Sequence, residues 1–142
     1  MATPSQNPNI VNVTVIKGNT AYLVSSGTSV TTTWTADGAS GGATTLTGLT
    51  PATGTVNKIG NIVVSNTSAS AVNCTVAISN NATFGSGTAY PIASAVSIPP
   101  NASLVVVDKT TSFYVTENQS VGLTSGTAGG VLTATASFEA IT

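Results

Sequence analysis

The stretch that decides the fold runs from Ile59 to Ser79 and reads IGNIVVSNTSASAVNCTVAIS. Residues 59–65 and 71–79 are rich in β-branched side chains, which pack well on a pleated surface. The second of these segments alternates apolar and polar residues, the period of a half-buried strand. Its apolar face holds Val72, Cys74, Val76 and Ile78. Residues 66–70 read NTSAS and are typical of a turn, so we predict two antiparallel strands joined at that turn.

Similar patterns recur along the whole chain. Further strands are predicted at residues 29–35, 104–107 and 131–140, among others. Residues 104–107 read LVVV, which predicts a strand buried on both faces. Residues 131–140 predict one face made of Leu132, Ala134, Ala136 and Phe138. About eight to ten short strands with regular turns indicate an all-β fold, namely a single antiparallel β-sandwich of the jelly-roll or Ig-like type.

The 142 residues suit one domain with an appendage. Residues 1–9 contain two prolines among polar neighbours and predict an extended N-terminal arm. Residues 10–142 form the predicted β-sandwich domain. Within it, the Gly/Thr-rich segment 38–55 has little to bury beyond Leu46 and Leu49. We expect a long loop there, either a flexible surface loop or an arm that contacts a neighbouring subunit.

The chain carries very little charge, which excludes several classes of function. Charged residues make up 5% of the sequence, against about 25% in an ordinary soluble protein. The three basic residues, Lys17, Lys58 and Lys109, are too few to follow a phosphate backbone, so we expect no nucleic-acid partner. No apolar run reaches the length of a membrane-spanning helix, and the first residues do not resemble a secretory signal. We therefore expect no membrane association.

The sequence offers no convincing catalytic, cofactor or metal residues. Histidine is absent, so serine has no ordinary base, and a single cysteine makes neither a disulfide nor a zinc site. The acids Asp37, Asp108, Glu117 and Glu139 are scattered along the chain, unlike the paired carboxylates of a glycosidase. One weak cation site between Asp108 and Glu117 remains open. We predict a protein that is not an enzyme.

Two residue types leave alternatives open. Cys74 lies on the apolar face of its strand, and we expect a buried thiol rather than a reactive one. Trp34, Tyr22, Tyr90 and Tyr114 are either core and interface anchors or a stacking platform for sugars. Because a β-protein with few charges leaves its edges unprotected, we also expect much of the surface to be covered in an assembly.

Three segments and the last strand of the second half form a characteristic pattern: residues 62–78, 98–109 (IPPNASLVVVDK), 113–121 (FYVTENQSV) and 132–141 (LTATASFEAI). The pattern is a strand, an Asn-Thr-Ser turn and a strand, then a proline corner before an apolar strand. A strand alternating Thr and Ala closes it. In this pattern residues 56–142 resemble small β-sandwich virion proteins of tailed bacteriophages.

The resemblance implies a structural protein of the virion. The leading expectation is a capsid cement, or decoration, protein on the capsid exterior, made in the bacterial cytoplasm. It would bind the major capsid protein as a homotrimer, with residues 1–9 and 38–55 contacting the lattice. The alternatives are a neck or tail adaptor and, from another class, a glycan-binding adhesive module that uses Trp34 and the tyrosines.

Overall fold

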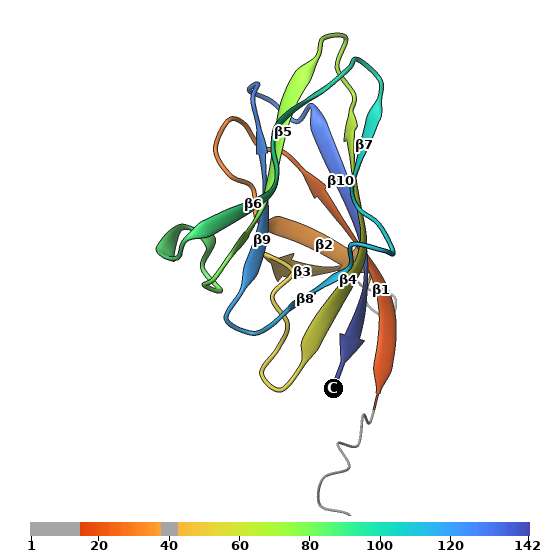
Figure 1. Ribbon diagram of the computed structural model, residues 1–142, viewed down its shortest axis with the longest axis vertical. Coiled ribbons are helices and arrows are strands. Elements are labelled where there is room, and N and C mark those ends of the chain that lie inside the picture. Colours follow the sequence, from red (N-terminus) through yellow and green to blue (C-terminus); the bar gives the residue numbers. More distant parts are fainter. Residues whose placement is uncertain (1–14, 38–42) are drawn as a thin grey trace, which may run out of the picture.

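The computed structural model describes residues 15–37 and 43–142, which form strands and one short 3₁₀ turn, η1 (Phe84–Ser86) (Figure 1). The arm predicted at residues 1–9 lies outside these ranges. Within them, no helix has the length and the apolar character that crossing a bilayer requires.

The larger of two sheets is antiparallel and has the strand order β3-β2-β1-β10-β4-β7, with β8 also pairing with β4. Its members are β1 (Ile16–Val24), β2 (Thr33–Asp37), β3 (Ala43–Thr47), β4 (Val56–Asn66), β7 (Ser103–Val107), β8 (Phe113–Val115) and β10 (Leu132–Ile141).

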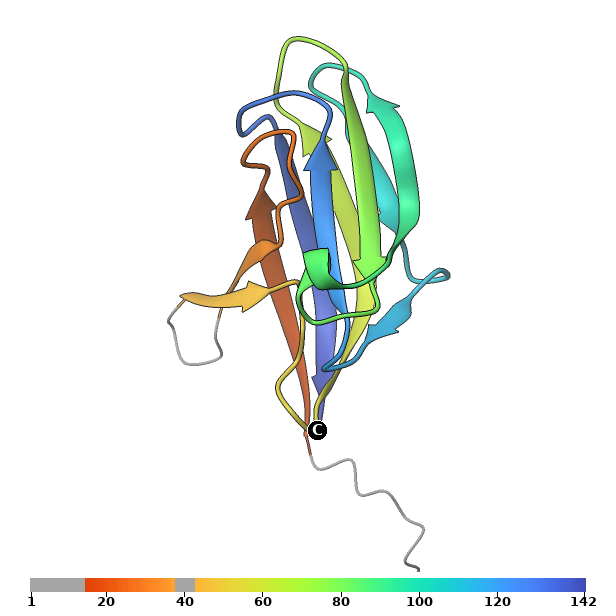
Figure 2. The same ribbon diagram turned by 90° about the vertical axis from the view of Figure 1, so that its left-hand side faces the viewer.

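The smaller sheet has the order β6-β5-β9 and covers one face of the larger one (Figure 2). Its strands are β5 (Val72–Ser79), β6 (Ala89–Ile98) and β9 (Ser120–Ser125). Side chains from both sheets form a single core around Trp34, Ile62 and Leu123. The predicted all-β, antiparallel sandwich is confirmed.

The core-facing pattern of the last strand is also confirmed. Leu132, Ala134, Ala136 and Phe138 are buried on one side of β10, and the intervening Thr and Ser residues face outward. β10 pairs with β1 on one side and with β4 on the other, so it lies in the middle of the larger sheet.

The predicted hairpin across residues 59–79 is wrong, because β4 and β5 belong to different sheets. Asn66 holds the crossing: its Nδ2 donates to the carbonyls of Ser70 (2.8 Å) and Ile98 (3.0 Å), and its Oδ1 accepts from the N–H of Ser68 (2.9 Å). The apolar faces of the two strands therefore meet across the core instead of lying side by side. This arrangement buries both faces.

The long loop predicted at residues 38–55 is partly wrong. Residues 38–42 lie outside the described ranges, but residues 43–47 form β3, in which Leu46 pairs with Trp34 of β2. Leu49 is fully buried, and its carbonyl accepts a hydrogen bond from Asn57 Nδ2 at 2.9 Å. The β-branched threonines favour a strand, and the two leucines supply the burial that holds this segment against the core.

Candidate docking surface

The two acids considered as a cation site lie in different turns. Asp108 Oδ1 accepts hydrogen bonds from the hydroxyl (2.7 Å) and the N–H (2.8 Å) of Thr110, and these bonds lower the pKa of Asp108. Glu117 Oε2 accepts from the N–H of Gly54 at 3.4 Å. Among the described residues, no three His, Cys, Asp or Glu side chains come together as metal ligands. The Asp108 carboxylate thus stabilises its own turn, whereas Glu117 contacts a turn that is distant in sequence.

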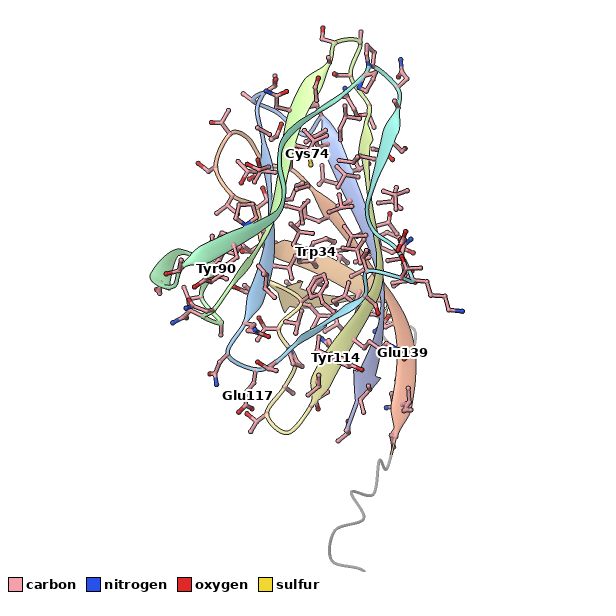
Figure 3. All side chains as sticks on the ribbon, viewed as in Figure 1. Trp34, Cys74, Tyr90, Tyr114, Glu117 and Glu139 are labelled. Carbon is pink, nitrogen blue, oxygen red and sulfur yellow. The ribbon has the colours of Figure 1, made fainter. Side chains whose placement is uncertain are left out.

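Trp34 is fully buried, so it is a core anchor and the sugar platform that depends on it is wrong. Its indole Nε1 donates to the carbonyl of Val121 at 3.2 Å, which links β2 of the larger sheet to β9 of the smaller one. The tyrosines lie on three different strands, with exposed rings: Tyr22 on β1, Tyr90 on β6 and Tyr114 on β8. Figure 3 places Tyr90 and Tyr114 on different sides of the molecule.

Cys74 is buried inside the sandwich, as its strand position predicts. Burial raises the pKa of the thiol from 9.0 to about 11, because the thiolate is poorly solvated there. The group is therefore an inert core side chain.

We expect Cys74 to resist alkylation. At pH 8 the raised pKa lowers the thiolate population about 100-fold, and burial slows access further. Iodoacetamide labelling followed by mass spectrometry should be at least that much slower in the native protein than in urea. Equal labelling rates in the native protein and in urea would contradict this expectation.

The same raised pKa makes stability depend on pH. The protonated thiol's contribution to stability is complete below pH 9 and is lost as the pH rises toward 11.

The most distinctive surface is the outer face, the side of the larger sheet turned away from the smaller sheet. Strand register aligns a row of residues across six strands: Thr45, Thr35, Tyr22, Thr135, Val63 and Val105. A parallel row contains Val24, Thr133, Ser65 and Ser103. None of these residues is charged, and Tyr22, Val24 and Val105 expose 45%, 57% and 58% of their surface.

The exposure of Val105 corrects the prediction that residues 104–107 are buried on both faces. β7 is the outermost strand of its sheet on this side, so only one of its faces meets the core. Leu104 and Val106 are partly buried on that inner side, whereas Val105 points outward.

A cavity of about 440 Å³, here called the hollow, interrupts the outer face beside the Tyr22 row. It forms where the pairing of β10 with β4 shifts register, and Gly18 and Gly60 leave space there because neither has a side chain. Lys58, Lys109 and Glu139 surround the hollow, and Lys58 lies directly opposite Glu139 in register. Lys58, Lys109 and Glu139 are thus grouped at the hollow, whereas the rows through Tyr22 and Val24 contain no charged residue.

The sequence does contain a signal for the outer face. A strand with one face in water should alternate apolar and polar residues, but residues 21–24 read AYLV and residues 104–107 read LVVV. Such runs also fit strands buried on both faces, so the pattern alone leaves the two readings open. The place of the strand in the fold decides between the two alternatives: β1 and β7 each have one side on the core and the other side exposed.

Comparison of the chain with protein-family models, with curated proteins and with solved structures finds no match.

Proposed function

We propose that this chain is a structural protein of a tailed-bacteriophage virion, and specifically a cement protein on the capsid exterior. It is made in the bacterial cytoplasm and binds the major capsid protein as a symmetric oligomer, a homotrimer. It acts by binding and not by catalysis. The observation that carries the proposal is the neutral outer face, and the resemblance of residues 56–142 to virion proteins supports it.

The outer face suits attachment to another flat protein surface. Six strands spaced by about 4.8 Å make it about 25 Å wide, and its two rows lie about 7 Å apart along the strands. Threonine hydroxyls supply adaptable hydrogen bonds, and Tyr22, Val24 and Val105 supply apolar area. Repeated over a lattice, such contacts add up to a stabilised shell.

Replacing Val24 with lysine is expected to weaken binding to capsids assembled without this protein by at least about tenfold. The substitution places an ammonium group inside an uncharged interface, where it has no partner and loses hydration. Binding is measured by co-sedimentation over a range of protein concentrations. Val24→Thr, which stays β-branched and uncharged on a face already rich in threonine, is the matched control and should bind within about twofold of the parent. Unchanged binding by Val24→Lys would contradict the proposed face.

The location in the virion is tested separately by electron microscopy of phage carrying a tagged copy. Label distributed over the capsid is the expected result. Label confined to the neck or tail would replace the cement protein with an adaptor of that assembly.

A further inference from the structure

The hollow on the outer face lies at an irregular point of the larger sheet. On one side of β4, the pairing with β10 passes from Ile59 to Asn61 and leaves Gly60 without a register partner. On the other side, the pairing with β8 ends at Ile59 and the pairing with β7 begins at Ile62. Bulges of this kind are frequent beside functional sites. The volume of about 440 Å³ is within the range of about 300–1,000 Å³ that is usual for small-molecule sites.

The hollow is surrounded mainly by side chains that donate hydrogen bonds. Two carry ammonium groups and three carry hydroxyl groups, which also accept: Lys58, Lys109, Thr20, Ser112 and Ser137. Among the described residues that line the hollow, only Glu139 carries a carboxylate. A ligand that matches this set presents an anionic group to the lysines and offers further groups that both donate and accept hydrogen bonds.

The charges around the hollow favour a ligand with a single negative charge. Lys58 and Glu139 lie opposite each other in register, so their charges largely compensate. Lys109 is the second cation. The neighbouring carboxylate, that of Asp108, is directed to its own turn, where Oδ1 accepts from the N–H groups of Thr110 (2.8 Å) and Thr111 (3.1 Å). One positive charge is therefore in excess among the lining residues, and a monoanion balances it.

Both lysines are held in place at their backbones. Lys58 is half-buried and lies between Glu139 and Tyr114 in register. Lys109 belongs to a turn that is closed by a hydrogen bond from the N–H of Thr111 to the carbonyl of Asp108, at 3.1 Å. Because these backbone positions are fixed before a ligand arrives, binding orders fewer groups and costs less entropy.

We propose that the hollow binds a small carboxylate that carries hydroxyl groups. The ligand's carboxylate accepts hydrogen bonds from the ammonium groups of Lys109 and Lys58. Its hydroxyls donate to Glu139 and exchange hydrogen bonds with Ser137 and Thr20. A doubly charged phosphate fits less well, because Glu139 repels the second charge. The inference does not rest on the proposed function, because it concerns a site that is measured on the free protein.

Titration of the isotopically labelled full chain with gluconate, followed by amide NMR, tests the site. Gluconate joins one carboxylate to a chain of hydroxyl groups. The amides of Gly18 and Gly60, which line the hollow, should shift and saturate in the millimolar range, whereas Gly85 in η1 should not move. Ionic strength is held constant with sodium chloride, because salt screens the lysines. Absence of shifts at Gly18 and Gly60 would overturn the proposal.

Two simpler probes test the chemical class of the ligand. Glucitol has the hydroxyls without the carboxylate, and we expect it to bind at least about tenfold more weakly than gluconate. Acetate has the carboxylate alone, and we expect it to bind at least about fivefold more weakly. Affinity equal to that of gluconate for either probe would overturn the proposed class.

Two lysine variants separate a site from a general effect of charge. Lys109→Gln should weaken gluconate binding about threefold to fivefold, as measured at Gly60. Lys17→Gln removes the same charge and is the matched control. Lys17 lies in register with Ala140, which pairs with buried Asn57, so it is on the opposite side of the sheet and should leave the affinity unchanged. Equal losses in both variants would overturn the site.

Discussion

Replacing Trp34 with alanine should lower the free energy of unfolding by about 3–5 kcal/mol. Trp34 is the largest fully buried side chain, and its loss leaves a cavity between the two sheets. It also removes the hydrogen bond from Nε1 to the Val121 carbonyl, which links β2 to β9. Because a domain of this size has a total stability of about 5–15 kcal/mol, a large share of it depends on one residue.

Urea unfolding followed by far-UV circular dichroism measures the change without needing the tryptophan as a probe. Trp34→Phe keeps a ring in the core but lacks the N–H donor, and should cost about half as much as alanine. A loss below about 1 kcal/mol for Trp34→Ala would show that the surrounding side chains collapse into the space.

Gly48→Ala should destabilise the protein by about 2–4 kcal/mol, from two causes that add. The φ angle of Gly48 is +66°, a conformation that residues with a Cβ rarely adopt, and an added Cβ would overlap the Cβ of Ser120. The backbone has little freedom to move away. The N–H of Gly48 donates to Thr32 at 2.6 Å, and its carbonyl accepts from Val121 at 2.7 Å.

Gly54→Ala separates the two causes. Gly54 has a similar φ of +79°, but nothing lies within 4 Å of the position that a Cβ would take. Its substitution should therefore cost only the conformational part, about 1 kcal/mol. Thermal unfolding of both variants in one buffer gives the comparison. Equal losses would mean that contact with Ser120 contributes nothing.

The sequence predicts which side chains face the core better than it predicts which strands are neighbours. A period of two is a local property of the sequence. It correctly places Leu132, Ala134, Ala136 and Phe138 of β10 on the core side, and it correctly predicts that Cys74 is buried. It says nothing of which sheet a strand joins. The turn at residues 66–70 is compatible with a hairpin or with a crossing between layers. The hydrogen bonds of Asn66 to Ser70 and Ile98 stabilise the crossing, and Ile98 is distant in sequence.

The candidate surfaces could be predicted only in part, for the same reason. Low charge indicates that some surface is covered, but the outer face arises because register aligns Tyr22, Thr135, Val63 and Val105 from four separate segments. β6 reads as an ordinary apolar strand, yet only Ile98 of its ten residues is buried. From the sequence, Trp34 is compatible with a surface platform or with a core anchor. Its complete burial between the two sheets shows that it is a core anchor.

The central position of β10 affects the order in which the molecule can fold during synthesis. β1, β2 and β3 lie on one side of β10, and β4, β7 and β8 lie on the other, so the two halves of the larger sheet are joined only through it. A ribosome delivers residues 132–141 after all the strands that they connect. Until then the nascent chain holds two unconnected half-sheets with open edges, which are prone to unwanted association. Completion of the larger sheet therefore requires β10, and we expect chaperones that shield nascent β-segments to raise the yield of this protein.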